Sequence, residues 1–428
     1  MADIKPFSAL RYDLSKAGKI EDLTCPPYDI ISEEQRIEFI SRNQYNAIRL
    51  ELPKGEEPYK EAKNILSQWI SDGILKTDMD PGIYIYEQEF LSKIDRGDVK
   101  RLRGLICRVR LEDFSSGVIL PHEETLSKAK EDRFNLMQAT NCNFSQIYSL
   151  YQDDSHITRE RLDNLASGIS PRYEFSDGLV THRLWVVNDT ESIKAIEEDF
   201  VSRKLYIADG HHRYETALNY KRYLKENNLY CPGGDYIMMM LVDMDNQGLV
   251  VFPTHRIIKD ISNFSTTSLL ESCKDYFEVV STENAETAQE ILKNGYDTGK
   301  HCFAFYDGAN WKVLVLIDSL IMDRLLPDKS ITYRNLDVTI LHTLILERLM
   351  GIDKENMASQ KNLSYTRSIN EAIDSVDRGE GCCCFLLNPT RVEEISSIAS
   401  CGEKMPQKST YFYPKLITGL VMNSLNTL

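Results

Sequence analysis

The stretch from residue 205 to residue 218 constrains the fold more than any other part of the chain. It reads Leu-Tyr-Ile-Ala-Asp-Gly-His-His-Arg-Tyr-Glu-Thr-Ala-Leu, so a short apolar run passes abruptly into a polar turn. The apolar run is typical of a buried strand, and apolar residues recur after the turn at helical spacing. Gly210 permits a sharp turn and close approach of the backbone to a ligand. The pattern therefore predicts a strand, a turn and the start of a helix.

A helix N-terminus of this kind is suited to an anion. Backbone N–H groups in the first turn have no partner within the helix, and the helix dipole adds partial positive charge there. Arg213 adds a planar fork of donors that matches a phosphate. We therefore expect Gly210, His212 and Arg213 to bind phosphate groups, with Asp209 and His211 beside them as candidate catalytic residues.

Structural roles are alternatives for the same side chains. Arg213 would then pair with a nearby carboxylate, either Asp209 or Glu215, and the histidines would serve as core or helix-capping residues. The two interpretations differ in phosphate affinity, because a purely structural arginine does not contact the ligand.

Composition limits the class of protein. At roughly 100 to 200 residues per domain, 428 residues predict two or three domains. The 42% hydrophobic and 27% charged residues are typical of a soluble globular protein, and no window approaches the roughly 20 apolar residues of a membrane span. The N-terminus lacks the apolar core of a secretory signal, which favours a cytoplasmic protein without membrane contacts. The net charge of −15 opposes binding to nucleic acid.

The order of expected elements predicts a mixed α/β (α+β) fold. Hairpin patterns dominate up to about residue 260, and short strands alternate with helices after it. We therefore expect an N-terminal α/β domain over residues 1–260, which contains the polar turn, and a C-terminal α/β domain over residues 261–428. The ten cysteines have no C-x-x-C pair or regular spacing, so we interpret them as reduced packing residues.

Two hairpins and one further strand are expected from local patterns. Residues 83–90 and 102–111 alternate and should pair through a charged turn at 95–98. Residues 236–243 and 249–252 should form a second hairpin. Residues 46–52 should form a strand.

Five residues outside the polar turn are further candidates for the site. Asp29 follows two prolines on a rigid loop, and we expect it to bind substrate, although a plain turn before a helix is an equal alternative. His122 and Glu123 lie at a strand-to-helix junction, where His122 would bind substrate and Glu123 would act as a base. The alternative for this pair is a solvated acidic first turn. His255 follows a strand and Lys408 lies in a Lys-Ser-Thr loop; we expect both to contact the cofactor, and a surface loop is the alternative for Lys408.

The Asp-Gly-His-His-Arg turn resembles the signature of the ParB/sulfiredoxin-like superfamily, in which a strand, a turn and a helix hold nucleotide phosphates. The form at residues 209–213 is similar to that of archaeal free serine kinases. Sulfiredoxins have cysteine where His211 stands, which argues against sulfinic acid reduction. Over its full length the chain resembles an uncharacterised bacterial and archaeal family, domain of unknown function one-zero-one-five, in the segments Pro26–Asp29, Pro121–Thr125, Tyr206–Leu218, Pro253–Arg256 and Met405–Thr410.

This resemblance implies a ParB/sulfiredoxin-like nucleotide-binding core with an additional α/β domain, and a kinase that transfers a phosphoryl group to an alcohol. ATP or ADP with Mg²⁺ would be its cofactors, and a small molecule such as an amino acid its acceptor. One alternative is a ParB-like, nucleotide-dependent regulatory or DNA-associated protein. Another is a metal-dependent hydrolase that uses His211, His212 and His255, although adjacent histidines on one turn rarely reach a single tetrahedral metal. The sequence leaves the metal and the oligomeric state open, with a homodimer as one option.

Overall fold

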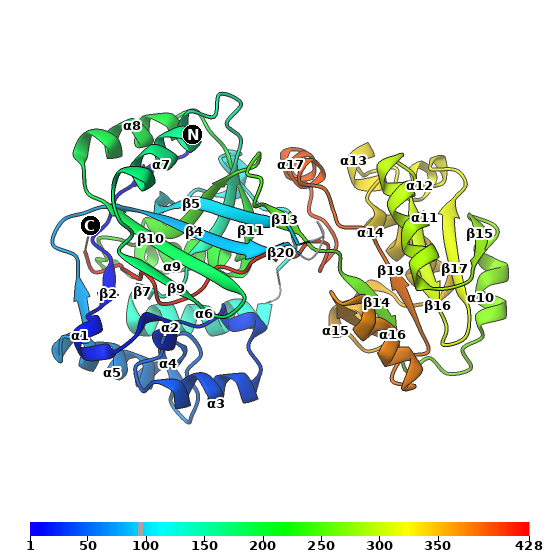
Figure 1. The fold of residues 1–428 in the computed structure, drawn as a ribbon, viewed down its shortest axis with the longest axis horizontal. Helices are drawn as coiled ribbons and strands as arrows, with labels where there is room; N and C mark the ends of the chain where they lie inside the picture. Colours follow the sequence, from blue (N-terminus) through cyan, green and yellow to red (C-terminus); the bar gives the residue numbers. More distant parts are fainter. Residues whose placement is uncertain (93–96, 126, 428) are drawn as a thin grey trace. The chain divides into compact units, whose positions relative to one another are not determined.

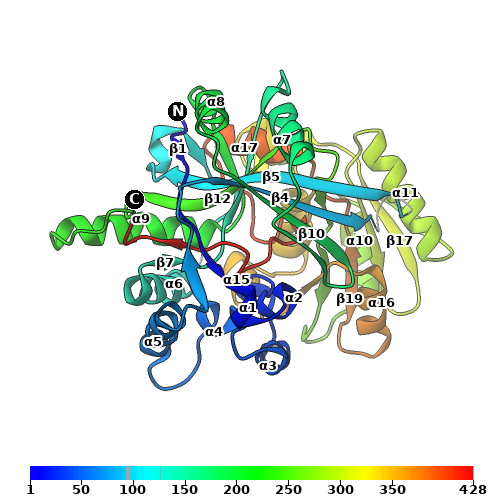
Figure 2. The same cartoon turned by 60° about the vertical axis from the view of Figure 1, so that its left-hand side comes forward.

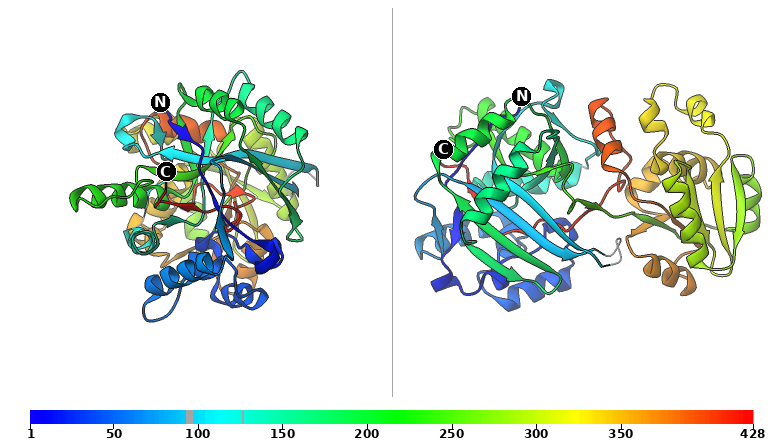
Figure 3. Two further views of the ribbon diagram at one scale, coloured as in Figure 1. Left: turned by 90° about the vertical axis from the view of Figure 1, so that its left-hand side faces the viewer. Right: turned by 45° about the horizontal axis from the view of Figure 1, so that its top comes forward.

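The computed structural model describes residues 1–92, 97–125 and 127–427 (Figure 1). Contacts within the chain divide it into two compact units. Unit 1 consists of Met1–Pro121, Thr125–Val250 and Pro414–Leu428, and unit 2 consists of His122–Glu124 and Val251–Tyr413. The last segment of the chain therefore belongs to the same unit as the first, and both termini lie in unit 1 (Figure 3).

Unit 1 is built on a mixed sheet with the strand order β6-β11-β8-β12-β5-β4-β10-β9, and β1 pairs with β5 outside this path. The β6–β11 and β8–β12 pairs are parallel, whereas the pairs of β5 with β4, β12 and β1 are antiparallel. The strands are β1 (Ile4–Lys5), β4 (Ile83–Leu91), β5 (Val99–Arg110), β6 (Ile119–Leu120), β8 (Ile147–Tyr151), β9 (Tyr173–Ser176), β10 (Val180–Val187), β11 (Leu205–Asp209) and β12 (Tyr236–Asp243).

Helices surround this sheet, with α6 beside α9 and α7 beside α8 (Figure 2). Short strand pairs join distant segments: β2 (Leu10–Tyr12) pairs with β3 (Leu75–Thr77), and β7 (Cys142–Asn143) pairs with β21 (Asn423–Ser424). The helices are α1 (Leu14–Ala17), α2 (Ile20–Leu23), α3 (Glu33–Arg42), α4 (Ile48–Glu51), α5 (Pro58–Ser71), α6 (Ser127–Thr140), α7 (Ile157–Gly168), α8 (Thr190–Phe200) and α9 (His211–Glu226), with 3₁₀ turns at Tyr28–Ile30 and Phe114–Ser116.

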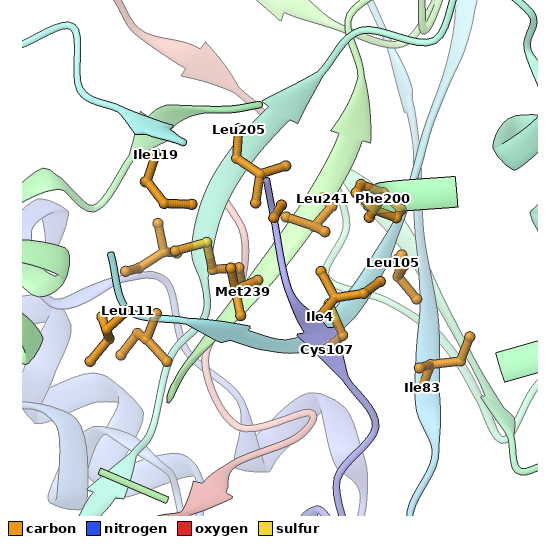
Figure 4. Packing of buried hydrophobic residues seen from close by; sticks show 14 of the residues in the cluster. Ile4, Ile83, Leu105, Cys107, Leu111, Ile119, Phe200, Leu205, Met239 and Leu241 are labelled. Carbon is orange, nitrogen blue, oxygen red and sulfur yellow. The ribbon is translucent and has the colours of Figure 1, made fainter. Parts of the chain in front are cut away.

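The main core of unit 1 lies against one face of the sheet. Alternate residues of the paired strands β5 and β12, such as Leu105 opposite Leu241 and Cys107 opposite Met239, are fully buried in it (Figure 4). Phe200 at the end of α8 and Leu205 at the start of β11 enter the same cluster. Ile207 of β11 and Tyr214 of α9 also belong to this cluster, so the two elements beside Gly210 both pack into the core.

Unit 2 contains a second sheet, in which every described pair is antiparallel, with the order β15-β17-β16-β19-β14-β18. Its strands are β14 (His255–Ile258), β15 (Phe277–Thr282), β16 (Cys302–Tyr306), β17 (Trp311–Leu316), β18 (Leu363–Thr366) and β19 (Cys383–Leu386), and β13 (Val250–Val251) pairs separately with β20 (Phe412–Tyr413).

Both faces of the second sheet are covered by helices. Neighbouring strand residues enter different clusters: Phe303 packs with residues of the helical segment 337–349, whereas Ala304 packs with residues of α11 and α16. The helices of unit 2 are α10 (Thr266–Cys273), α11 (Ala285–Asp297), α12 (Leu320–Leu325), α13 (Ile331–Arg334), α14 (Asp337–Ile340), the π-helix η3 (Leu341–Leu349), α15 (Lys354–Ser359), α16 (Ile369–Asp377) and α17 (Val392–Ser400).

The mixed α/β fold is confirmed, and so are the strand, turn and helix around Gly210. The pairing of β4 with β5 is also confirmed, while residues 95–96 of the expected turn lie outside the described residues. Two local predictions are wrong. Residues 48–51 form a helix rather than a strand, and β13 pairs with β20 rather than with β12.

The ten cysteines are free. Within the described residues, no helix is both long and apolar enough to cross a membrane. The sheet of unit 2 begins with β14, five residues before the predicted domain boundary at residue 260. That boundary, as a point of independent folding, stays a prediction.

Candidate functional site

The polar turn lies between β11 and α9 because Gly210 adopts a left-handed conformation, with φ of 94°. Residues with a Cβ rarely adopt this conformation, so glycine allows the chain to pass directly from a buried strand into a helix. Helix α9 then runs for 16 residues, and its buried residues include Tyr214, Ala217 and Leu218. The strand and the helix are both held by the core, so the turn between them has little freedom to move.

Asp209 is held by two cations at the end of β11. Its Oδ1 accepts a hydrogen bond from Lys415 Nζ, and its Oδ2 accepts one from Arg213 Nη2 at 3.1 Å. Arg213 also donates to Ser145 Oγ at 2.9 Å and to the Gln146 carbonyl at 2.7 Å. The ion pair between Arg213 and Asp209 is the structural contact that the sequence offered as an alternative. It joins the two ends of the turn.

Ser145 also contacts a second ion pair, between Glu51 and Arg133. Ser145 Oγ donates to Glu51 Oε1 at 2.9 Å, and Arg133 Nη1 lies 3.7 Å from the same oxygen. Arg133 is 5% exposed, and its guanidinium lies 4.1 Å from the centre of the Tyr28 ring. Burial raises the pKa of Tyr28 to about 12, while Arg133 and Arg213 act in the opposite direction. The positive charges of Arg133 and Arg213 therefore both reach the Tyr28 hydroxyl.

A small cavity of about 40 Å³ is lined by Glu51, Arg133, Ser145, Arg213 and neighbouring apolar side chains. A buried water needs roughly 10–15 Å³ of such volume, so the cavity has room for only a few water-sized groups. A nucleotide is too large for it. A larger ligand could place only a small group inside this cavity.

The other side of α9 is fixed by ion pairing to α6. Glu215 Oε2 accepts hydrogen bonds from Lys130 Nζ at 2.8 Å and from Thr125 Oγ1 at 2.7 Å. Glu215 is therefore paired with Lys130 rather than with Arg213. His211 is 5% exposed and His212 is half-buried. These contacts orient the first two turns of α9.

The candidate residues fall into both compact units. Asp29 is exposed in the 3₁₀ turn Tyr28–Ile30 of unit 1. His122 in unit 2 is fully buried, and its Nε2 lies 2.9 Å from Thr410 Oγ1. Glu123 forms a backbone bridge with Met405 of the same unit. The sequence predicts that Asp29, His122 and His255 converge on the turn, and this convergence stays a prediction.

His255 and Lys408 also belong to unit 2. His255 is 1% exposed, and its Nδ1 accepts a hydrogen bond from the Leu387 backbone N–H at 3.3 Å. Burial, and then the neighbouring Arg256, lower the pKa of His255 to about 4, so its ring is neutral near pH 7. Lys408 is exposed in a left-handed conformation with φ of 60°. Within the described residues, no group of three His, Cys, Asp or Glu side chains is arranged to hold a metal ion.

Sequence reasoning missed four residues that surround the turn: Glu51, Arg133, Ser145 and Lys415. Lys415 lies 206 positions from the carboxylate that it contacts. Glu51 and Arg133 are almost fully buried charges, but the sequence shows neither burial nor pairing. The one local signal was Ser145 and Gln146 immediately before an apolar strand, where polar residues mark a strand end.

The family model described as "Protein of unknown function (DUF1015)" matches residues 4–339. The chain belongs to this family. No curated protein sequence matches it.

Solved structures with a similar arrangement include a conserved hypothetical protein from Pyrococcus furiosus, with 14% identity and a TM-score of 0.36 over 75% of this chain and 95% of that one. A free serine kinase in complex with AMP has 14% identity and a TM-score of 0.37, covering 74% and 92%. SbnI with a C-terminal truncation from Staphylococcus aureus has 10% identity and a TM-score of 0.34, covering 74% and 86%.

Proposed function

We propose that this chain binds the phosphates of a nucleotide at the 209–213 turn and transfers a phosphoryl group to the hydroxyl of a small molecule. The observation that carries the proposal is the left-handed Gly210 at the N-terminus of a 16-residue helix, with Arg213 and Lys415 held beside it by Asp209. Arg213, Lys415 and Asp209 together carry one net positive charge, and this charge at a helix N-terminus favours an anion.

Asp209 serves in this proposal first as a positioning residue. Its two oxygens hold Lys415 and Arg213 in place before the phosphate arrives, so the ligand meets donors that are already oriented. Arg213 and Lys415 then neutralise charge on the phosphate. His212 and the backbone of Gly210 complete the group of phosphate contacts.

The nucleotide is ATP or ADP, and Mg²⁺ bound with it would supply positive charge to the transferring phosphoryl group. Mg²⁺ prefers oxygen ligands, and Asp209 is the carboxylate at the turn that would hold it.

The acceptor is a small alcohol such as a hydroxyl-bearing amino acid. Its hydroxyl proton passes to a base, for which Glu123, Asp209 and His211 are the candidates. Asp29 and His122 are assigned to the acceptor, and His255 and Lys408 to the cofactor. A homodimer in solution is part of the proposal and is measured by light scattering.

A thermal-shift series with ATP, ADP and inorganic phosphate, each with and without Mg²⁺, tests the proposal. A ligand that binds only the folded state raises the melting temperature, by about 2.7 kcal/mol of stability at 100 times its Kd. We expect ATP or ADP to raise it and Mg²⁺ to increase the effect. Phosphoryl transfer is then followed by nuclear magnetic resonance of ³¹P over a panel of amino acids. Failure of every nucleotide to bind overturns the proposal.

A further inference from the structure

Unit 2 contains a fully buried arginine that has no acidic partner among the residues that the structure describes. Arg256 on β14 is 0% exposed, and among the described residues Tyr365, rather than any carboxylate, is the titratable group that acts on its charge. Its Nη1 donates to the Thr254 carbonyl, its Nη2 lies 3.2 Å from His342 Nε2 and 3.4 Å from the Lys408 carbonyl, and its Nε has no hydrogen-bond partner. A buried charge of this kind is costly unless a counter-charge offsets it.

His342 contacts Arg256 and also lines a neighbouring cavity. A guanidinium can only donate, so His342 Nε2 accepts the hydrogen bond from Arg256 and the ring proton of the neutral histidine is on Nδ1. Burial, and then Arg256, lower the pKa of His342 well below its ordinary value, which keeps the ring neutral near pH 7. His342 lines the cavity and has no other hydrogen bond among the described residues, so its Nδ1–H is available to donate to a ligand there.

The cavity beside His342 has a volume of about 150 Å³ and lies wholly within unit 2. Tyr333, Met357 and Tyr365 give it apolar walls, and Lys329 and Glu347 are among the charged residues that line it. Tyr365 also lies next to Arg256, with its ring centre 5.4 Å from the guanidinium carbon. The wall around His342 is formed by a π-helix, an element that often occurs at functional sites.

A second buried polar group lines the same cavity. Thr339 is 1% exposed, and its hydroxyl oxygen has no hydrogen bond of ordinary geometry among the described residues. Burial, and then the nearby acidic residues, raise the pKa of Tyr333 to about 12, and hydrogen bonding between the Tyr333 and Thr339 side chains acts in the opposite direction. Tyr333 therefore keeps its proton. Hydroxyl groups and the His342 Nδ1–H make this wall rich in donors.

We propose that this cavity binds a small monocarboxylate with an apolar, ring-sized or branched body. The carboxylate accepts from His342 Nδ1–H and Thr339 Oγ1–H and offsets the charge of Arg256 behind them. Its apolar body packs between Tyr333, Met357 and Tyr365. None of the residues that line the cavity belongs to the turn at 209–213.

Size limits the ligand. A cavity of about 150 Å³ lined by apolar side chains is known to accept benzene, so this cavity suits a ring of that size and is too small for a nucleotide. The charged lining residues Lys329, Lys354, Glu124 and Glu347 balance one another in number. The positive charge in excess is that of Arg256, which selects an anion over a neutral molecule of the same shape.

Isothermal titration of the full chain with benzoate, cyclohexanecarboxylate and 3-methylbutanoate tests the proposal, and benzamide is the neutral counterpart of benzoate. We expect saturable binding of at least one carboxylate, and at least ten-fold weaker binding of benzamide than of benzoate. Thr339→Val replaces the hydroxyl by a methyl group of similar size next to Tyr333, so it should preserve the fold and weaken carboxylate binding about ten-fold, the scale of one hydrogen bond to a charged group.

Two tryptophan substitutions on α15 give a matched pair. Ala358 is exposed and lines the cavity mouth, whereas its neighbour Ser359 is exposed and does not line it. Ala358→Trp should weaken carboxylate binding more than ten-fold, and Ser359→Trp should change it less than two-fold, both with the melting temperature of the original protein. The proposal is overturned by the absence of binding for all three carboxylates, by equal affinity for benzoate and benzamide, or by full binding in Ala358→Trp.

Discussion

At the scale of single residues, Asp209 connects parts of unit 1 that are distant in sequence. It pairs with Arg213 in the next turn of the chain and with Lys415 near the C-terminus. Arg213 in turn reaches Ser145, which contacts Glu51. The chemistry of the turn therefore depends on contacts that are set by the fold, and single substitutions separate their structural and binding roles.

Arg213→Lys should weaken nucleotide or phosphate binding by about 1 to 3 kcal/mol, because lysine lacks the planar fork that reaches several acceptors at once. Titration calorimetry with ATP, ADP and phosphate measures the change. Arg222→Lys, on the exposed face of the same helix, is the control and should bind as the original protein does. An unchanged affinity with a lowered melting temperature would assign Arg213 a structural role alone.

Gly210→Ala should abolish phosphate binding and also destabilise unit 1. A Cβ at this position would lie 2.9 Å from Arg213 Nη2, so the arginine must move, and the left-handed backbone adds roughly 1 to 2 kcal/mol of strain. Gly178 has nearly the same φ, and a Cβ there meets nothing within 4 Å. Gly178→Ala therefore carries the strain without the displacement. Equal phosphate binding in the two variants would refute the role of Arg213 displacement.

At the scale of elements, β14 contributes a pH dependence to unit 2. The pKa of His255 is lowered from 6.5 to about 4 in the folded protein, so protonation favours the unfolded chain. At about 1.36 kcal/mol for each pKa unit, neutral His255 contributes roughly 3 kcal/mol to the free energy of unfolding. This contribution is fully present above pH 6.5 and is lost as the pH falls to about 4. We expect the unfolding free energy to fall over this range.

His255→Gln provides the comparison for this pH dependence, because glutamine accepts from the Leu387 N–H without titrating. Urea unfolding at pH 7.5, 5.5 and 4.5 should show a smaller loss of stability in the variant than in the original protein. Protonation of His342 and of the carboxylates is shared by both proteins and cancels in the difference. Parallel pH curves would show that His255 is not protonated on unfolding in this range.

The local sequence pattern of residues 46–52 gave a wrong prediction of secondary structure. Residues 46–52 have the composition of a strand, but Asn46 accepts from the Ile48 N–H and starts a helical turn, and its Nδ2 donates to the Asp22 and Thr24 carbonyls. These contacts reach across more than 20 positions. Tertiary hydrogen bonds therefore decided between helix and strand here.

At the scale of the whole molecule, the chain segment after Tyr413 completes unit 1. It buries six large apolar side chains, namely Leu416, Ile417, Leu420, Val421, Met422 and Leu425. At about 1.5 to 3 kcal/mol each, their burial matches the roughly 5 to 15 kcal/mol that stabilise a domain. A chain truncated after Tyr413 should therefore fail to fold in unit 1, as judged by loss of cooperative thermal unfolding.

Lys415→Met is the point-substitution control for this truncation. It keeps the apolar segment and removes one cation from Asp209. We expect it to fold and to bind phosphate more weakly than the original protein. A truncated chain that unfolds cooperatively at the original temperature would show that unit 1 does not depend on its last segment.

Limited proteolysis tests how the two units fold. We expect the first cleavages near residues 250–260, where the chain passes from β12 to β14 through the short strand β13. Cleavage inside 205–225 contradicts a buried turn, because β11 and the apolar side of α9 lie in the core. Mass spectrometry of the first stable fragments identifies the cut.

The sequence by itself determined the mixed α/β class, the strand and helix around Gly210, and the pairing of β4 with β5. Each of these depends on patterns that repeat over a few residues, such as alternation in a strand or a glycine between two elements. Only the tertiary structure decided that Lys415 reaches Asp209, that Arg133 and Glu51 are buried together behind Ser145, and that Arg256 has no acidic partner among the described residues. Such contacts join positions up to 206 residues apart, and their geometry depends on how the sheets pack rather than on any neighbouring residue.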